Sequence, residues 1–473
     1  IFTDEAIYVR WTQYLLSSPK FWDFSMTDGK GPTFIWIASL FMRLVSEPLL
    51  AVRLVSVVAG AGSMVGLFFL GQEVFKNRKI GFITSFIYAI YPFALVYDRL
   101  ALYESMVSMF IIWSLYFEII LVRRLKLGNA LILGIIMGFG MLTKTNVNFA
   151  LYLLPFSLLI FDFKSKKWKA NFRKWIIYAV ISAIIANLIY ASLRISPYFY
   201  IIAQKDTTFV YPFREWIHHP FTFFPGNIKG LGTWVMQYMT LPVLILVGSS
   251  FIAEKKYLRE KLLLLVWFVA PFTALALFGK VIYPRYTLFM SMPLLVLGSY
   301  SLYCMYIRSK KKYLKVLVVL VFLLSYVLND FLILTDFNKS SIPQSDKNQL
   351  IASWPSGVGV KETVEFLKEK SKTGKIYVGT EGTFGLMPYS LEIYLKDNQN
   401  IRTQGFWPMH ALPPKEALES AKTVPTYFVF YQPCDVCPAT GIVPKSWQVK
   451  QVFQIAKVEK GSYYTLYQIM PQK

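Results

Sequence analysis

LLAVRLVSVVAGAGSMVGLFFLGQEVFKNRK, residues 49–79, is the stretch that decides the fold class. It is nearly uncharged as far as Phe75, and the chain then reaches Lys76, Arg78 and Lys79. A helix of about 20 apolar residues crosses the hydrocarbon core of a bilayer, and Lys and Arg mark the cytoplasmic ends of such helices. The stretch therefore predicts a membrane span that ends on the cytoplasmic side.

Other apolar stretches alternate with short loops along the chain. They lie at residues 80–97, 103–122, 127–143, 147–161, 176–195, 232–252, 262–279, 286–307 and 314–334. Basic clusters follow Val122, Asp162, Ala253 and Ile307, where an alternating path returns to the cytoplasm. We predict a polytopic α-helical membrane protein with about ten spans in this sequence. An earlier span is expected to deliver the N-terminal segment to the outer side, which makes eleven in the full chain.

Composition agrees with a membrane protein. Hydrophobic residues make up 55% of the chain and charged residues only 16%, whereas soluble domains carry about 25% charged residues. The net charge of +23 would suit a nucleic-acid partner. The basic loops account for much of this charge, so we expect contact with membrane lipids and no binding of nucleic acid.

Two domains are predicted. Residues 1–339 form a transmembrane domain whose first outer loop is 1–48, and residues 340–473 form an extracytoplasmic α/β domain. In the second domain, helices are expected at 361–370 and 389–395 and strands at 375–378, 426–431, 449–455 and 462–469. Cys434 and Cys437 would lie where a disulfide can form, and Cys304 is expected to be structural within a span. The role of this domain stays open.

The first outer loop contains a pair of carboxylates at a helix start. Asp4 and Glu5 precede a run in which Ile7, Trp11, Tyr14 and Leu15 share one face. The simplest interpretation is that Asp4 caps the helix. A second apolar run at 33–45 is short and interrupted by a charge, which predicts an amphipathic helix lying on the outer membrane surface.

Several short motifs resemble one family of membrane enzymes. They are Asp4-Glu5 with Tyr8 and Arg10; Gly29-Lys30-Gly31-Pro32; Asp98-Arg99-Leu100-Ala101 with Glu104; Leu142-Thr143-Lys144; and Lys280 with Pro284-Arg285-Tyr286 and Pro293. In order, spacing and predicted outer location they resemble the GT-C type of polyprenyl-phosphate-dependent glycosyltransferases. The resemblance is to the branch of protein O-mannosyltransferases and lipid A aminoarabinose transferases.

Two departures from the family pattern bear on function. Thr145-Asn146 follows Lys144, where the family often has Gly. The chain also lacks anything like the Trp-Trp-Asp motif of oligosaccharyltransferases. The second departure argues against transfer of a whole oligosaccharide to Asn.

The resemblance implies roles for individual residues. Transfer of a sugar from a lipid phosphate needs a base for the acceptor hydroxyl and positive charge for the departing phosphate. By its match to the first acidic motif, Asp4 is the expected base, with Glu5 as its neighbour. Asp98 and Glu104 would form a second acidic group that holds the acceptor or a divalent cation. The expected donor and phosphate ligands are Lys30, Arg99, Lys144, Lys280, Arg285 and Tyr286.

The residue types also allow structural interpretations. Asp98, Arg99 and Glu104 would serve equally as a salt-bridge cluster at helix ends, and Lys30, Lys144 and Lys280 as lysines that snorkel to the headgroups. His218-His219 would need help to converge on one metal ion. No cofactor is certain, although the acidic group is compatible with a divalent cation.

The predicted reaction is transfer, with inversion, of a monosaccharide from dolichyl or undecaprenyl phosphate to a lipid, glycan or protein acceptor. No P-loop or dinucleotide-binding motif is present in the sequence. The expected location is a prokaryotic plasma membrane, with the catalytic face and C-terminal domain extracytoplasmic. The aromatic loop 196–230 is either an interface anchor or a lid that responds to substrate.

Two other function classes fit a polytopic chain. A flippase or transporter would place ionisable residues near the bilayer centre and often show repeated halves. Here the candidate residues cluster at outer helix ends, with Glu118 and Arg53 as exceptions close to span ends. A catalytically dead scaffold would need a lost acidic motif, and both acidic motifs are present. These comparisons favour the transferase.

Overall fold

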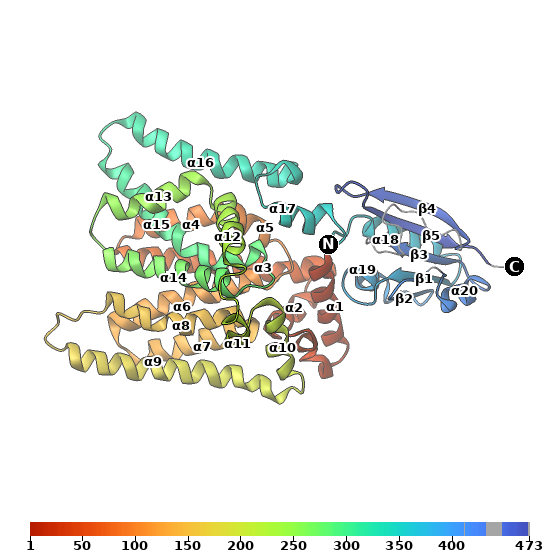
Figure 1. Cartoon of the computed structure of the whole chain (residues 1–473), viewed down its shortest axis with the longest axis horizontal. Coiled ribbons are helices and arrows are strands. Elements are labelled where there is room, and N and C mark those ends of the chain that lie inside the picture. Colours follow the sequence, from red (N-terminus) through yellow and green to blue (C-terminus); the bar gives the residue numbers. More distant parts are fainter. Residues whose placement is uncertain (411, 432–446, 472–473) are drawn as a thin grey trace. The chain divides into compact units, whose positions relative to one another are not determined.

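The computed structural model describes residues 1–410, 412–431 and 447–471. The predicted pair Cys434 and Cys437 lies outside the described residues. The chain divides into two compact units (Figure 1). The helical unit comprises Lys20–Ala38 and Arg53–Pro343, and the sheet unit comprises Ile1–Pro19, Ser39–Val52 and Gln344–Lys473.

The helical unit is built from long apolar helices and shorter helices between them. Their bounds, including those of two helices that continue across a unit boundary (α2 and α3), are α2 (Thr33–Met42), α3 (Pro48–Phe75), α4 (Arg78–Ala89), α5 (Pro92–Tyr97), α6 (Glu104–Arg124), α7 (Leu127–Thr143), α8 (Asn148–Leu153), α9 (Trp168–Ala191), α10 (Phe199–Phe209), α11 (Phe213–Trp216), α12 (Phe224–Met239), α13 (Leu241–Ala253), α14 (Leu258–Phe278), α15 (Leu288–Arg308) and α16 (Lys312–Thr335).

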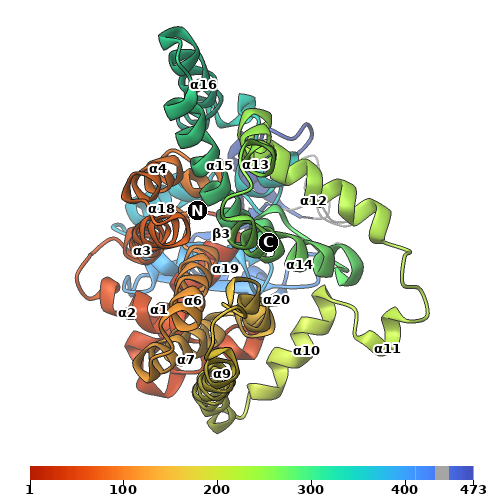
Figure 2. The same cartoon turned by 90° about the vertical axis from the view of Figure 1, so that its left-hand side faces the viewer.

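Helix α15 is the most deeply buried helix among the candidate spans. It packs against α4, α6, α13 and α14, which surround it in the view along the helices (Figure 2). Its sequence carries no charge before Arg308. A helix that is apolar on all sides is expected at such a central position.

Six helices among the described residues are long and apolar enough to cross a membrane, or seven if the pair α12 and α13, bent by 98°, is one span. The predicted count of ten spans is not confirmed. The predicted span at 80–97 is divided between α4 and α5 before Pro92, which cannot donate a backbone hydrogen bond. The span predicted at 127–143 is the 17-residue α7, and that at 147–161 ends in a 3-10 segment containing Pro155.

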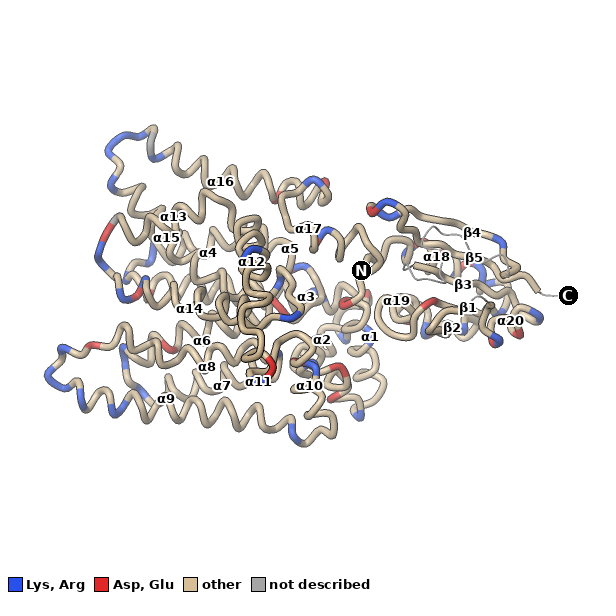
Figure 3. Tube along the Cα trace, in the orientation of Figure 1, with Lys and Arg blue, Asp and Glu red and all other residues tan. Residues whose placement is uncertain are grey.

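Basic residues gather at one end of the helical unit. The loops that follow α3, α6, α13 and α15, and the segment before α9, lie at that end, and Figure 3 shows their Lys and Arg residues together. Each of the five basic clusters in the sequence therefore falls on the same side of the bundle. This is the asymmetry that membrane topology requires.

The sheet unit contains a mixed five-stranded sheet in the order β2-β1-β3-β5-β4. The strands β2, β1 and β3 are parallel neighbours, and β5 is antiparallel to β3 and β4. Its elements are α1 (Thr3–Ser17), α17 (Gln344–Lys347), α18 (Val360–Lys370), β1 (Ile376–Glu381), α19 (Leu386–Leu395), β2 (Ile401–Phe406), α20 (Lys415–Ala421), β3 (Thr426–Phe430), β4 (Val449–Ala456) and β5 (Tyr463–Ile469).

Aromatic residues fill the core of this sheet. Phe428 packs against Phe406, Phe430 and Trp447, and Phe430 also contacts Tyr467. The predicted small α/β domain is therefore present. The sequence did not predict β2 or α20, because β2 is an edge strand of mixed polarity and α20 is short.

Helix α1 belongs to the sheet unit although it opens the chain. The predicted apolar face is present, with Ile7 and Trp11 buried and Tyr14 and Leu15 half-buried. Removing a residue as large as Trp11 from water contributes about 2–3 kcal/mol. The helix packs on α19, whose residues follow it by more than 350 positions.

Candidate active site

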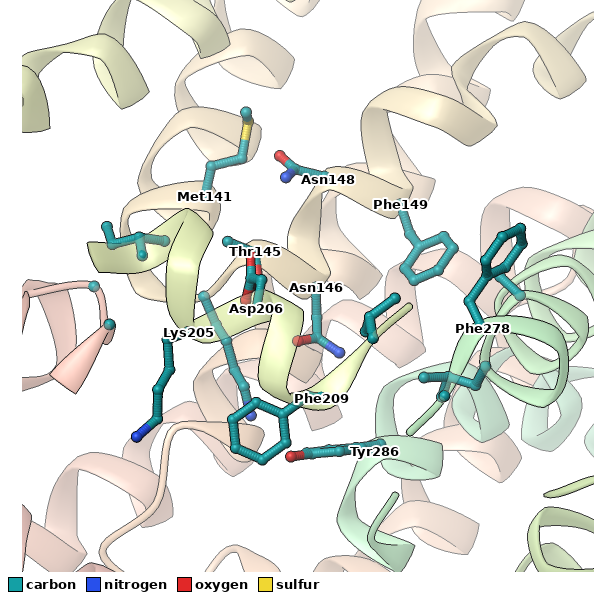
Figure 4. A pocket seen from close by; sticks show the side chains of 18 of the residues that line it. Met141, Thr145, Asn146, Asn148, Phe149, Lys205, Asp206, Phe209, Phe278 and Tyr286 are labelled. Carbon is teal, nitrogen blue, oxygen red and sulfur yellow. The ribbon is translucent and has the colours of Figure 1, made fainter. Parts of the chain in front are cut away.

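A cavity of about 330 Å³ lies in the helical unit (Figure 4). Four segments line it: the loop 29–31, residues 141–152, helix α10 with Val210, and residues 274–279 with Val281; Tyr190 and Tyr286 complete the wall. Most of the wall is apolar, including Phe149, Phe209 and Phe278. Such a cavity with a few charged groups suits a small polar ligand attached to an apolar chain.

Lys144 and Arg285 approach one carboxylate beside this cavity. Lys144 Nζ lies 2.7 Å from Glu104 Oε1, and Arg285 Nε lies 3.6 Å from the same oxygen. The three side chains are 18%, 11% and 8% exposed in the order Lys144, Arg285 and Glu104. Because charges this buried are stable only when paired, the cluster holds each side chain in one orientation and keeps a net charge of about +1.

Tyrosine rings support the two cations. Lys144 Nζ lies 4.9 Å from the centre of the Tyr286 ring, and Arg285 Cζ lies 4.7 Å from that of Tyr283. Cation–π contacts of this kind contribute about 0.5–2 kcal/mol each. Lys144 and Tyr286 line the cavity directly, whereas Glu104 and Arg285 line a very small void next to it that shares Asn146 with the cavity.

Lys30 reaches the cavity from a loop that tolerates only glycine on either side. A Cβ on Gly31 would lie 1.9 Å from the carbonyl oxygen of Leu142, and one on Gly29 would lie 2.4 Å from Cβ of Lys205. Gly29 also has a φ of +69°, which favours glycine. The Gly-Lys-Gly sequence therefore lets the loop press against α7 and α10. In this position Lys30 Nζ lies 5.4 Å from the Phe209 ring centre.

Helix α10 supplies polar groups that the sequence did not predict. Lys205 Nζ lies 2.5 Å from Asp28 Oδ1, and Thr145 Oγ1 donates a hydrogen bond of 3.3 Å to Asp206 Oδ1. Burial raises the pKa of Asp206, and the hydrogen bond from Thr145 opposes that shift. The departure from the family pattern after Lys144 was the available signal, since Thr145 and Asn146 both line the cavity (Figure 4).

Other predicted residues do not line this cavity. The Asp98 carboxylate accepts a 2.7 Å hydrogen bond from Tyr88 Oη, and burial raises the pKa of Asp98 to about 6. Arg99 interacts electrostatically with Arg53 and Asp330. Lys280 Nζ lies 3.0 Å from Glu215 Oε2 and 4.4 Å from the ring centre of Tyr211.

The first acidic pair belongs to the sheet unit. Asp4 and Glu5 occupy the first turn of α1. Glu5 is fully buried, whereas Asp4 is half-buried. Of the two carboxylates, Asp4 is therefore the one with surface left to meet a substrate.

A metal centre is not evident in the described ranges. No group of three or more His, Cys, Asp or Glu side chains within them converges to hold an ion. In the predicted His pair, His219 packs against Tyr211 with ring centres 4.8 Å apart.

Comparisons with known proteins identify the fold. Residues 29–191 match the family model of dolichyl-phosphate-mannose-protein mannosyltransferase. The crystal structure of ArnT from Cupriavidus metallidurans bound to undecaprenyl phosphate is similar to this chain with a TM-score of 0.57 at 14% identity, over 99% of this chain and 95% of that chain. The chain has the fold of the GT-C glycosyltransferases. The resemblance predicted from the short motifs is confirmed.

More distant GT-C structures agree. AglB, the oligosaccharyltransferase of Archaeoglobus fulgidus, in complex with an inhibitory peptide and a dolichol-phosphate, is similar with a TM-score of 0.51 at 13% identity, over 91% of this chain and 65% of that chain. The complex of an Archaeoglobus fulgidus oligosaccharyltransferase with Zn and sulfate has a TM-score of 0.52 at 14% identity, over 85% of this chain and 59% of that chain. A search of curated proteins gave no match.

Proposed function

We propose that this protein is an integral membrane glycosyltransferase that transfers a monosaccharide from a polyprenyl-phosphate donor to a lipid, glycan or protein acceptor. One observation carries the proposal: Lys30 and Lys144 line an apolar cavity beside Arg285 in a GT-C fold. ArnT in the similar structure is bound to undecaprenyl phosphate. A phosphate on an apolar chain has the chemistry that this cavity complements.

In the proposed site, the cations stabilise the leaving phosphate. Breaking the bond between the anomeric carbon and the phosphate oxygen leaves the electron pair, and thus additional negative charge, on the lipid phosphate. Positive groups held in place before the reaction lower this barrier, because they need not reorganise as charge develops. The planar guanidinium of Arg285 matches phosphate geometry, and the ammonium groups of Lys30 and Lys144 add point charges.

Glu104 is proposed as the group that positions these cations. Its Oε1 atom is shared by Lys144 and Arg285, so one of its two carboxylate oxygens is already engaged by positive charge. Two cations beside this oxygen disfavour the binding of a divalent cation at the same atom. This assigns Glu104 a different task from the one that the motif suggested.

Asp4 is proposed as the base, on the strength of its match to the family's first acidic position. It would accept the proton of the acceptor hydroxyl as the hydroxyl oxygen attacks the anomeric carbon. Attack opposite the leaving phosphate in a single displacement inverts that carbon. The greater exposure of Asp4 than Glu5 supports the choice between them.

The reaction is proposed to occur on the extracytoplasmic side of a prokaryotic plasma membrane. Five basic clusters lie at one end of the helical unit (Figure 3), and that end is expected in the cytoplasm. Lys30 and Lys144, which line the cavity, lie in loops predicted on the opposite, extracytoplasmic side of the membrane. A donor would then enter laterally from the outer leaflet.

The decisive experiment measures turnover of the purified, lipid-reconstituted protein with a panel of polyprenyl-phosphate monosaccharides and candidate acceptors. Release of polyprenyl phosphate by the wild type and its loss in Asp4→Asn, with donor binding retained, would support the proposal and identify the sugar. Equal turnover in Asp4→Asn would remove the proposed base. Donor translocation without bond cleavage would indicate a flippase, and turnover with and without a chelator tests for a divalent cation.

A further inference from the structure

Helix α1, which carries Asp4, is held within the sheet unit by polar contacts at its N-terminal end and near its middle. We infer that the C-terminal part of the sheet unit, residues 344–471, positions the proposed base, and that Arg10, Glu392 and Lys457 are the positioning residues. The inference rests on the proposed function. It gives a role to a domain whose role the sequence left open.

The first attachment joins α1 to α19. Arg10 Nε donates to Glu392 Oε2 at 2.7 Å, and the side chains of Arg10 and Glu392 are only 15% and 22% exposed. Arg10 Nη1 also donates to Gln13 Oε1 at 3.1 Å, and Gln13 Nε2 donates to the backbone oxygen of Ile393 at 3.0 Å. Two consecutive residues of α19 are therefore bonded to one face of α1.

Aromatic contacts surround the first attachment. The ring centres of Tyr14 and Tyr389 lie 6.4 Å apart, as do those of Trp11 and Phe384. The Arg10 guanidinium lies 4.4 Å from the centre of the Tyr14 ring. This packing limits water at the ion pair, so the pair is stronger than an exposed one.

The second attachment holds the N-terminal end of α1. Thr3 donates to the backbone oxygen of Pro355 through its backbone N at 3.0 Å and through its Oγ1 at 3.2 Å. Phe2 forms a β-bridge with Ser356. The residues immediately before Asp4 are therefore bonded to the segment 353–356.

Lys457 fastens that segment to the sheet. Its Nζ lies 3.0 Å from the backbone oxygen of Tyr431, and 3.5, 3.2 and 3.4 Å from those of Ser353, Trp354 and Ser356. Lys457 is 6% exposed. Burial of an ammonium group costs desolvation energy, which contacts with carbonyl oxygens offset. Pro355, which accepts the hydrogen bonds from Thr3, lies between Trp354 and Ser356, whose backbone oxygens Lys457 contacts.

Two attachments determine the placement of Asp4 within the sheet unit more strictly than one. The bond at Thr3 restrains the translation of the helix end, and the bond from Arg10, almost two turns later, restrains its rotation. A general base must lie within hydrogen-bond reach of the proton that it accepts, and a displacement of about 1 Å can lower turnover about 100-fold. Loosening either attachment should therefore reduce the chemical step.

Donor binding provides the contrast that separates positioning from folding. Lys30, Lys144 and Arg285 belong to the helical unit, whereas Arg10, Glu392 and Lys457 belong to the sheet unit. A variant that only loosens α1 should lower kcat and leave the donor affinity near the wild-type value. A variant that damages the whole protein should lower both.

The test compares Glu392→Gln with Glu365→Gln in the full-length, lipid-reconstituted protein. Glu365 pairs with Lys361 at 3.9 Å on the exposed face of α18, so it is a matched control in the same unit. We expect Glu392→Gln to lower kcat by about 10- to 100-fold, to change the donor Kd less than 2-fold, and to increase amide hydrogen exchange in residues 3–10. Lys457→Met should act in the same direction, and the reversed pair Arg10→Glu with Glu392→Arg should recover part of kcat.

Either of two results would overturn the inference. In the first, Glu392→Gln would match Glu365→Gln both in the hydrogen exchange of residues 3–10 and in kcat. In the second, Glu392→Gln would lose kcat and donor affinity in parallel, and the reversed pair would not recover them. Wild-type and Asp4→Asn turnover in the same experiment judge the proposed function separately. If wild-type turnover were absent, that function would fail, while hydrogen exchange would still decide whether Glu392 holds α1.

Discussion

Lys144 Nζ and Glu104 Oε1 are 2.7 Å apart, which joins the residue after α7 to the first residue of α6. The pair brings together two short motifs that lie 40 positions apart. Removing one partner of a buried ion pair leaves an uncompensated charge. Substitution of Glu104 should therefore change the net charge beside the cavity in the opposite direction from substitution of Lys144.

Replacing the carboxylate should strengthen phosphate binding while impairing turnover. In Glu104→Gln the net positive charge beside the cavity increases, so we expect the Kd for polyprenyl phosphate to fall by about 3- to 10-fold. The kcat should fall because Lys144 and Arg285 lose their common anchor. Titration of lipid phosphate and steady-state kinetics measure the two effects, and weaker phosphate binding would contradict the assignment.

Arg285 should contribute to donor affinity through its charge and its shape. We expect Arg285→Ala to weaken donor binding by about 10- to 100-fold, the effect of losing a charge-assisted hydrogen bond. Arg285→Lys should restore only part of the affinity, because it cannot bind in a bidentate manner. Lys229, which is exposed on α12, provides the control Lys229→Ala, for which little change is expected.

Asp206 should discriminate the sugar from the lipid phosphate. Its carboxylate lines the cavity and accepts a hydrogen bond from Thr145, so it can also accept hydrogen bonds from sugar hydroxyls. In Asp206→Asn we expect kcat/KM for the glycosylated donor to fall by about 10-fold or more, while polyprenyl phosphate without sugar binds normally. An equal loss for both ligands would place Asp206 in phosphate binding or in folding instead.

The loop that carries Lys30 should not tolerate a methyl group. Gly31→Ala puts a Cβ 1.9 Å from the backbone oxygen of Leu142, so the loop must move. We expect destabilisation of about 2 kcal/mol or more and loss of donor binding. Gly128→Ala, where no atom lies within 4 Å, should be neutral or stabilising by up to about 1 kcal/mol, as thermal unfolding can show.

Lys457 should make stability depend on alkaline pH. Burial lowers the pKa of Lys457 from 10.5 to about 8, while Glu381 and Glu459 oppose that shift. Between these values the unfolded chain binds more protons than the folded chain, so stability rises with pH across this window. The gain is at most about 3 kcal/mol.

Lys457→Met should remove this contribution. The free energy of unfolding of the wild type minus that of Lys457→Met should therefore increase from pH 8 to pH 10.5. Tyr431 also faces Lys457 and is present in both proteins, so its titration largely cancels in the difference. A difference that stays constant over this range would contradict the shifted pKa.

Local sequence patterns were sufficient for much of the architecture. The apolar stretch ending at Phe75 became α3, and the strands near Thr426 and Val449 appeared where alternation and β-branched residues indicated them. The span at 80–97 failed as one helix because Pro92 outweighs the apolar composition around it. A hydropathy value averaged over a window of residues does not detect that one proline in the window lacks a backbone N–H group.

The site was less predictable because it depends on contacts between distant segments. Lys30, Lys144 and Arg285 could be selected from motifs, since each stands beside residues that the family shares. Asp206 stands in a helix without any such motif, and its hydrogen bond to Thr145 and its place in the cavity wall are visible only in the folded structure. The assignment of α1 to the sheet unit was equally hidden, because Arg10 and Glu392 are separated by 382 positions.

That separation has a consequence for biogenesis. The ribosome makes α1 before the helices of the helical unit and α19 only after all of them have been synthesised. A nascent chain that has reached Pro343 already contains Lys30, Lys144 and Arg285, but it lacks the segment that holds α1. Under the proposed function, the ability to take up a lipid donor would therefore precede the ability to use it, which would begin only after residues 344–395 have been translated.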